Sequence, residues 1–205
     1  MLYPRTDFID GKEALVHELQ MVGYKEHMFQ KHRVMYLTGV ITGEVDSRHL
    51  LMTLDSLSHE PIKIFITSAG GDLDSTFLFY DTIKMIESPV IIIGEYCASA
   101  AAILLASGSK RYLYPHAKTM LHLPAGQMGG DARDWDIQVK QMNQYKNRVV
   151  DILKDCGATK DREEILNDMD RDFWMDADET IQYGLADGIL TKDILKNLIN
   201  NKGGV

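Results

Sequence analysis

Short apolar runs that alternate with helical stretches are the feature that most constrains the fold. Four runs rich in branched or aromatic residues are short enough for buried strands: residues 33–37, 62–67, 89–94 and 118–123. Apolar residues at helical spacing fall between them, at Leu50, Leu51, Leu54 and Leu57 and again at Phe77, Tyr80, Ile83, Met85 and Ile86. This order predicts an α/β fold with mainly parallel strands.

Both ends of this alternating region carry longer amphipathic helices. Residues 12–32 form the first, and residues 132–155 form the second, which stops before Cys156 and Gly157. The second has an apolar stripe at Trp135, Val139, Met142, Val149 and Ile152. A complete α/β domain does not need so long a stripe, so the stripe packs either on its own domain or on another subunit.

The composition disfavours several classes of protein. The 205 residues suffice for one domain, and a net charge of −8 disfavours a general basic surface for nucleic acid or acidic lipid. The chain has two cysteines, Cys97 and Cys156, so no disulfide framework is implied. Its apolar runs are far shorter than the roughly 20 residues of a membrane helix. We expect a cytoplasmic protein with one domain over residues 1–205.

Two segments that follow predicted strands could carry chemistry. The two glycines of Ser68-Ala69-Gly70-Gly71 let the backbone turn sharply beside a helix N-terminus. This segment is either half of an oxyanion hole or a plain strand-to-helix turn. Ser99 follows the 89–94 strand and opens an apolar helix, which makes it an exposed nucleophile at the carboxyl edge of the sheet or an N-cap.

A nucleophilic serine needs a base and an orienting carboxylate. Of seven histidines, His122 is the one at the end of a predicted strand, although a histidine there can also be structural. Its rival His116 lies in Tyr-Pro-His-Ala, which is typical of a turn. Three carboxylates lie in a suitable segment, and the residues alone do not choose between Asp168, Asp170 and Asp172. We find no metal-ligand cluster with usable spacing and expect no cofactor.

In order and spacing, these pieces resemble the ClpP family of serine peptidases, over about residues 33–190. The motifs that carry the resemblance are RVMYLTG, SAGG with FYDTIKMI, CASAAAILLASG, PHAKTMLHLP and DMDRDFWMDADETIQYGLADGIL. The resemblance implies a ClpP/crotonase-like fold with a protruding handle at residues 124–155 and an N-terminal segment and helix at 1–32. It also implies a ring-shaped homo-oligomer, two stacked heptamers forming a tetradecamer, that works with an AAA+ unfoldase.

The resemblance assigns a role to each matching residue. Ser99 matches the nucleophile, His122 the general base and Asp172 the orienting carboxylate. The backbone N–H groups of Gly71 and Ala100 match the oxyanion hole. Asp134 and Arg171 match a charge contact between rings.

The chain departs from the family at several positions. Ala69 stands where the family usually has proline, and Ala100 where it usually has methionine. The backbone N–H donors of the oxyanion hole do not depend on these side chains. Lys63 stands where the family often has an aromatic residue in the unfoldase docking pocket, and a charge there weakens an apolar site. Residues 1–32 also do not resemble the usual axial-loop sequence of the family. Whether the chain works with an unfoldase therefore stays open, and this pattern is typical of a divergent paralogue or a phage-type member.

The sequence therefore predicts a serine endopeptidase that degrades peptides or unfolded proteins inside a ring. The alternative is a non-catalytic ring subunit, against which the complete serine–histidine–aspartate set argues. A crotonase-type acyl-CoA enzyme shares the fold but does not need that set.

Overall fold

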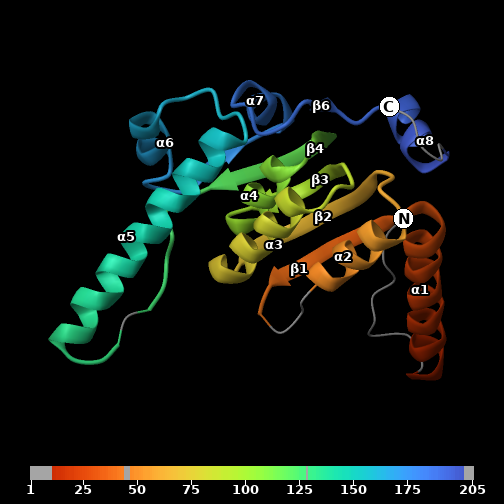
Figure 1. Cartoon of the computed structure of the whole chain (residues 1–205), viewed down its shortest axis with the longest axis horizontal. Helices are drawn as coiled ribbons and strands as arrows, with labels where there is room; N and C mark the ends of the chain where they lie inside the picture. Colours follow the sequence, from red (N-terminus) through yellow and green to blue (C-terminus); the bar gives the residue numbers. More distant parts are fainter. Residues whose placement is uncertain (1–10, 44–46, 128, 201–205) are drawn as a thin grey trace.

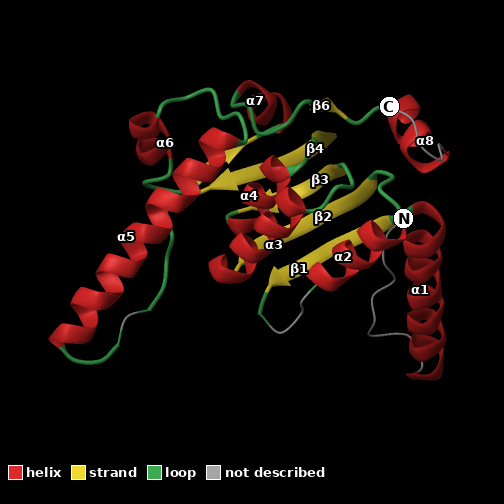
Figure 2. Cartoon of the chain, viewed as in Figure 1, coloured by secondary structure: helices red, strands yellow, loops and turns green. Residues whose placement is uncertain are grey.

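A computed structural model describes residues 11–43, 47–127 and 129–200 of the chain. Within them, a sheet in the order β1-β2-β3-β4-β5 forms the centre, and β6 pairs with β4 (Figures 1 and 2). The first four strands are parallel, and β5 is antiparallel to β4. The mainly parallel α/β fold is thus confirmed. The strands are β1 (Val34–Ile41), β2 (Ile62–Gly71), β3 (Val90–Ala98), β4 (Lys110–Leu121), β5 (Phe173–Met175) and β6 (Gly188–Ile189).

Three helices cover one face of the sheet: α2 (Arg48–Leu57), α3 (Leu73–Met85) and α4 (Ala100–Ser107) (Figure 1). Every residue of α4 is buried, so this helix forms the centre of the layer. The predicted leucine face of α2 is divided, because Leu51 and Leu54 are buried whereas Leu57 is exposed. Burying these aliphatic side chains between sheet and helices is the main driving force for this layer.

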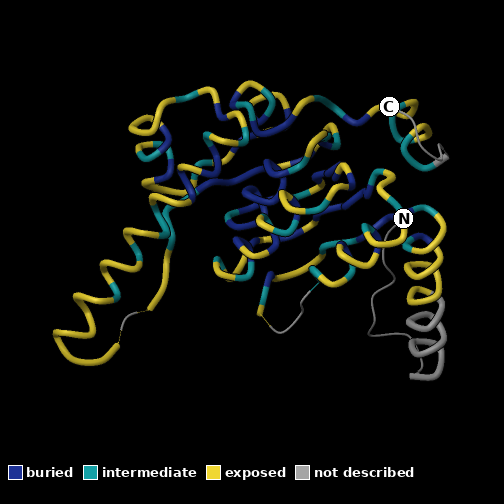
Figure 3. The backbone as a smooth tube through the Cα atoms, in the orientation of Figure 1, coloured by how far each residue is buried: buried dark blue, intermediate teal, exposed yellow. Residues whose placement is uncertain are grey.

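The long helix α5 (Ala132–Asp155) projects from one end of the sheet (Figure 1). Asp131 starts it with a capping box, in which its carboxylate accepts hydrogen bonds from the backbone of Arg133 and Asp134. In its last third, Val149, Val150, Ile152 and Leu153 are buried and pack with residues of α4, whereas the earlier part has no buried residue and is mostly exposed (Figure 3). The small helices α6 (Arg162–Asp168) and α7 (Ala177–Gln182) lie between α5 and β6 along the chain.

The helices α1 (Gly11–His32) and α8 (Lys192–Asn200) lie at the opposite end (Figure 1). Met28 of α1 and the apolar side of α8 pack on the second face of the sheet, against Phe65 and Leu190. His32 Nδ1 lies 3.0 Å from the carbonyl oxygen of Ile199, which joins the two helices. The expected N-terminal segment before residue 11, and the side chains of residues 11–20 in the predicted amphipathic helix, lie outside the described residues.

The fourth strand is longer than the sequence predicts. β4 begins at Lys110, eight residues before the run at 118–123, and it ends at Leu121. Pro115 and His116, which we assigned to a turn, lie within β4 at a point where its register with β3 shifts. Because Pro115 has no N–H to donate to the ladder, it marks this irregular stretch.

A buried pair of cations lies where β1 and β2 begin. Arg33, predicted as the first residue of β1, instead adopts a left-handed conformation with φ 53° between α1 and β1. Its guanidinium donates to three backbone carbonyls, at Leu54, Ser58 and Glu60. Lys63 is also buried. Burial lowers the pKa of the Lys63 ammonium below its ordinary value, Arg33 lowers it further, and Glu60 acts in the opposite direction.

We expect Lys63→Met to raise the free energy of unfolding at pH 7, by on the order of 1 kcal/mol, because an apolar side chain replaces a buried cation. A cation whose pKa is lowered in the folded state binds more protons in the unfolded state. Stability therefore rises with pH between the lowered pKa and about 10.5.

The gain from Lys63→Met should accordingly shrink as the pH is raised towards 10. Urea unfolding at matched subunit concentration, at several pH values, measures it. Lys140→Met, at an exposed lysine of α5, is the control and should change little. A loss of stability in Lys63→Met, or a gain that does not depend on pH, would contradict the burial argument.

Candidate active site

Ser99 lies at a strained junction between β3 and α4. It directly follows Ala98, the last residue of β3, and its backbone has φ 58° and ψ −124°. A residue other than glycine rarely adopts such a conformation, and those that do cluster at functional sites. Although Ser99 occupies the N-cap position of α4, its side chain makes no capping hydrogen bond. The N-cap interpretation of this serine therefore does not hold, and the hydroxyl is available for another contact.

That contact is with His122. The Ser99 Oγ atom lies 2.7 Å from Nε2 of His122, and both residues are partly buried. The parallel pairing of β3 with β4 brings them together, because Ala98 is in register with Met120 and each functional residue follows at the same sheet edge. The Ser99 N–H also donates to the Met120 carbonyl at 2.8 Å. A hydroxyl at this distance from an imidazole nitrogen is within reach of a general base.

Strand register also separates the three candidate carboxylates. β5 pairs antiparallel to β4, and the ladder ends with Phe173 opposite Leu121. One further step of this register would bring Asp172 opposite His122. Asp168 instead accepts hydrogen bonds from Lys160 and Tyr183. Asp172 is exposed, and in the part of the chain that the structure describes no hydrogen bond joins it to His122. Register thus favours Asp172, and its role stays a prediction.

The glycine segment brings the end of β2 against Ser99. Gly70 has φ 94°, and a Cβ on it would lie 2.8 Å from the Cβ of Ser99. Gly71 has φ 150°, and a Cβ there would lie 2.1 Å from the Ile41 carbonyl oxygen. Only glycine fits at either position. Asp72 then starts α3 by accepting from the Ser75 N–H at 2.8 Å.

A cavity of about 180 Å³ lies next to Ser99 and His122. Gly71, Ser99, Ala100 and His122 line it together, so the two proposed oxyanion donors belong to residues on its wall. The rest of the wall is apolar and comes from Leu73, Ile103, Leu121, Pro124, Ala125, Val149 and Met169. Sequence reasoning did not assign these residues to the site, because they come from segments far apart in the chain.

The rival reactive groups are placed elsewhere. Cys97 is completely buried, and burial strongly raises the pKa of its thiol, so it is a poor nucleophile. His116 is exposed within β4 and does not take part in the contact with Ser99.

Asp134 and Arg171 make separate contacts within one chain. The Asp134 carboxylate accepts from the Asp131 N–H in the capping box of α5. Arg171 is exposed and donates to the Asp170 carbonyl. A contact between two rings, which the resemblance implies for this pair, involves a second copy and stays a prediction.

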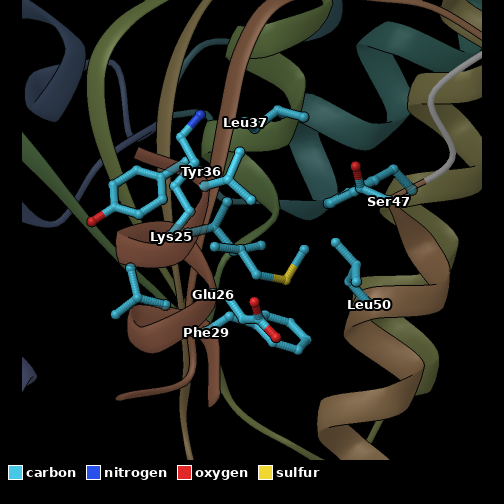
Figure 4. Close-up of a pocket in the computed structure, with 12 residues that line it drawn as sticks. Lys25, Glu26, Phe29, Tyr36, Leu37, Ser47 and Leu50 are labelled. Atoms are coloured by element: carbon cyan, nitrogen blue, oxygen red, sulfur yellow. The ribbon is translucent and has the colours of Figure 1, made fainter. Parts of the chain in front are cut away.

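A second cavity, of about 340 Å³, lies between α1, α2 and β1 (Figure 4). Phe29, Leu37 and Leu50 face it, with Lys25 and Glu26 of α1 and the hydroxyl of Ser47 at its margin (Figure 4). The Tyr36 ring points away and stacks on Phe65. Histidine and cysteine are missing from the described residues that line it. Among its described lining residues, this cavity therefore has no counterpart of the Ser99–His122 pair.

A serine on a strained strand-to-helix junction, next to a histidine and facing glycine backbone, is an arrangement typical of serine hydrolases. Comparison with known proteins gives the family. The family model described as Clp protease matches residues 20–193.

Curated relatives agree with this match. The chain is 38% identical over 168 residues to the "ATP-dependent Clp protease proteolytic subunit" of Carsonella ruddii, covering 79% of this chain and 86% of the relative. It is 33% identical over 168 residues to "ATP-dependent Clp protease proteolytic subunit 1" of Rhodopirellula baltica, covering 78% of this chain and 73% of the relative. The "ATP-dependent Clp protease proteolytic subunit 1" of Chlamydia muridarum is 38% identical to the chain over 136 residues, covering 64% of this chain and 70% of the relative.

The chain belongs to the Clp protease family, a family of serine peptidases. The resemblance drawn from the sequence motifs is confirmed.

We expect Ser99→Ala to lower peptide hydrolysis by roughly 10⁴-fold or more, because the change removes the nucleophilic oxygen. It should leave the fold intact, since the hydroxyl makes no capping bond. Turnover of a fluorogenic peptide measures the loss, and circular dichroism checks the fold. Cys97→Ala is the control and should remain active. Turnover in Ser99→Ala equal to that of the unmodified chain would exclude Ser99 as the nucleophile.

Asp172→Asn should lower kcat by several orders of magnitude, roughly 10⁴-fold, because an amide does not stabilise the required form of His122. Asp170→Asn, two residues away and also exposed, should change kcat by less than about threefold, since surface substitutions have small effects. Steady-state kinetics on both variants distinguishes them. A damaging Asp170→Asn with an active Asp172→Asn would move the orienting carboxylate to Asp170.

Proposed function

We propose that the chain is a serine endopeptidase subunit that hydrolyses peptides and unfolded protein segments. The observation that carries this proposal is the 2.7 Å approach of Ser99 Oγ to His122 Nε2 in a cavity shared with Gly71 and Ala100. Membership of the Clp protease family supports it. The substrate enters as an extended backbone, and an apolar side chain of the substrate fits the aliphatic wall of the cavity.

The reaction follows from the positions of these groups. His122 accepts the hydroxyl proton as Ser99 Oγ attacks the scissile carbonyl, and the backbone N–H groups of Gly71 and Ala100 stabilise the oxyanion. His122 then donates that proton to the leaving amine, which leaves an acyl group on Ser99. Water, activated by His122, releases the acyl group and restores the enzyme. Asp172, opposite His122 in the extended register, stabilises the imidazolium that forms in each step.

We further propose that the subunits assemble into heptameric rings, and that two rings stack through α5. The helix has 24 residues, which corresponds to about 36 Å, and most of its length is not covered by its own domain. Trp135 and Val139 are one helical turn apart and about half exposed. An apolar stripe on a projecting helix fits a second copy of the same helix.

The partner that would deliver unfolded protein is an AAA+ unfoldase, as the relatives' name "ATP-dependent" suggests. Lys63 is buried beside Arg33, on the strand face that also carries Phe65. The apolar side of α8 packs on this face. A docking surface here therefore differs from the aromatic one that the resemblance implies. A place in the cytoplasm stays a prediction.

A non-catalytic ring subunit is the second candidate. The observation that favours it is the exposed Asp172, which makes no hydrogen bond to His122 among the described residues. The two candidates differ in one measurable property, since only the first predicts turnover by the assembled particle.

We expect the purified chain to form particles of seven or fourteen subunits that cleave a fluorogenic peptide. Val139→Asp should shift the particles towards single rings or smaller species and lower the activity, because it places a charge in the apolar stripe of α5. Gln141→Asp adds the same charge on another side of the helix, and it should change neither the size of the particles nor their activity.

Mass photometry and peptide turnover on the same samples make this test. Monomer only at micromolar concentration would contradict the ring. Assembled particles without turnover would favour the non-catalytic subunit.

A further inference from the structure

The segment that carries Asp172 is attached to β4 on both sides of His122. The N–H of Leu123, just after His122, donates to the Met169 carbonyl at 2.8 Å. Leu121, just before His122, pairs with Phe173 in the β4–β5 ladder. The three residues between these attachments, 170–172, are exposed. The position of Asp172 therefore depends on how the two ends of the 169–173 loop are held.

Lys160 contacts both ends of this loop. Its Nζ atom lies 2.7 Å from Oδ2 of Asp168, the residue just before the loop. The same ammonium lies 5.4 Å from the centre of the Phe173 ring, at the other end of the loop. These distances correspond to a charge-assisted hydrogen bond and a cation–π contact. One side chain thus joins the start and the end of the segment that carries Asp172.

Tyr183 completes the cluster from α7's C-terminal end. Its hydroxyl donates to the same Asp168 oxygen at 3.0 Å, and its ring centre lies 5.8 Å from that of Phe173. Lys160 Nζ lies 5.3 Å from the Tyr183 ring centre. Tyr183 is buried, so the contacts form in a partly dry environment in which they hold their geometry.

The backbone that carries Lys160 is itself fixed. The Lys154 ammonium at the end of α5 donates to the carbonyls of Ala158 and Lys160, at 3.0 and 2.7 Å. The Thr159 N–H donates to the Tyr183 carbonyl at 3.0 Å. Lys160 therefore extends from a segment that both α5 and the end of α7 hold in place.

We propose that Lys160 is a positioning residue for the triad: with Tyr183, it clamps the two ends of the 169–173 loop and so sets where Asp172 lies relative to His122. The proposal rests on the proposed function, because it needs Asp172 to act on His122. Lys160 contacts neither the substrate cavity nor the reacting atoms. Its effect on turnover passes through the loop that carries Asp172.

Lys160→Met removes the ammonium and keeps an unbranched apolar stem. We expect it to lower kcat for a fluorogenic peptide by roughly 10-fold, since small misplacements of a catalytic group are costly. KM should change less than kcat, because Met169 is the one residue of the 169–173 loop that lines the cavity. Lys160→Arg should recover most of the loss. Arg162→Met removes a cation that pairs with Asp151 and should leave kcat unchanged.

The decisive comparison uses Asp172→Asn as the background. If Lys160 acts through Asp172, adding Lys160→Met to Asp172→Asn costs little more, whereas a general structural role multiplies the two losses. The rate at which a fluorophosphonate labels Ser99 gives this comparison when turnover is too slow. Tyr183→Phe, which removes one hydroxyl, repeats the test if Lys160→Met does not fold.

The failures of the two proposals are distinguishable. A fully active Asp172→Asn would overturn the triad itself. A damaging Asp172→Asn together with a fully active Lys160→Met, or with multiplied losses in the double variant, would overturn only the clamp.

Discussion

Parallel pairing between the ends of β3 and β4 is the interaction on which the site depends. Ala98 lies in register with Met120, and the Ser99 N–H continues this pairing by donating to the Met120 carbonyl. Because both strands end at one edge of the sheet, the residues that follow them meet there. The strained backbone of Ser99 then turns its hydroxyl towards His122, and the fully buried helix α4 holds that turn in place. Such strain persists only where the surroundings determine it.

The sequence predicts the parts of the site that lie at the ends of apolar strands. Ser99, His122 and Gly71 are of this kind, because the end of an apolar strand has a local pattern, and a helix follows closely after Ser99 and Gly71. The early start of β4 was missed, since Pro115 interrupts the β-type run. The residues alone do not choose Asp172 among three carboxylates; the family resemblance assigns it, and the β4–β5 register favours it. The contacts of Lys160 have no local pattern, because Phe173 and Tyr183 meet it only in the folded chain.

One hydrophobic cluster connects the projecting helix with the site. Val149 of α5 belongs to the cluster that includes Leu121 and Met169, and all three line the cavity at Ser99. The same helix presents its exposed apolar stripe some turns earlier. Close packing transmits small shifts between such neighbours. Contacts made by the exposed part of α5 in an assembly can therefore bear on the cavity wall and on the loop that carries Asp172.

Covalent labelling tests the central claim most directly. The assembled protein is treated with a fluorophosphonate, which reacts with activated serines, and the modified residue is identified by mass spectrometry. If Ser99 is a nucleophile activated by His122, a single adduct forms on Ser99, and His122→Ala abolishes it. An adduct on a different residue, or an assembled particle that takes up no label, would contradict the account.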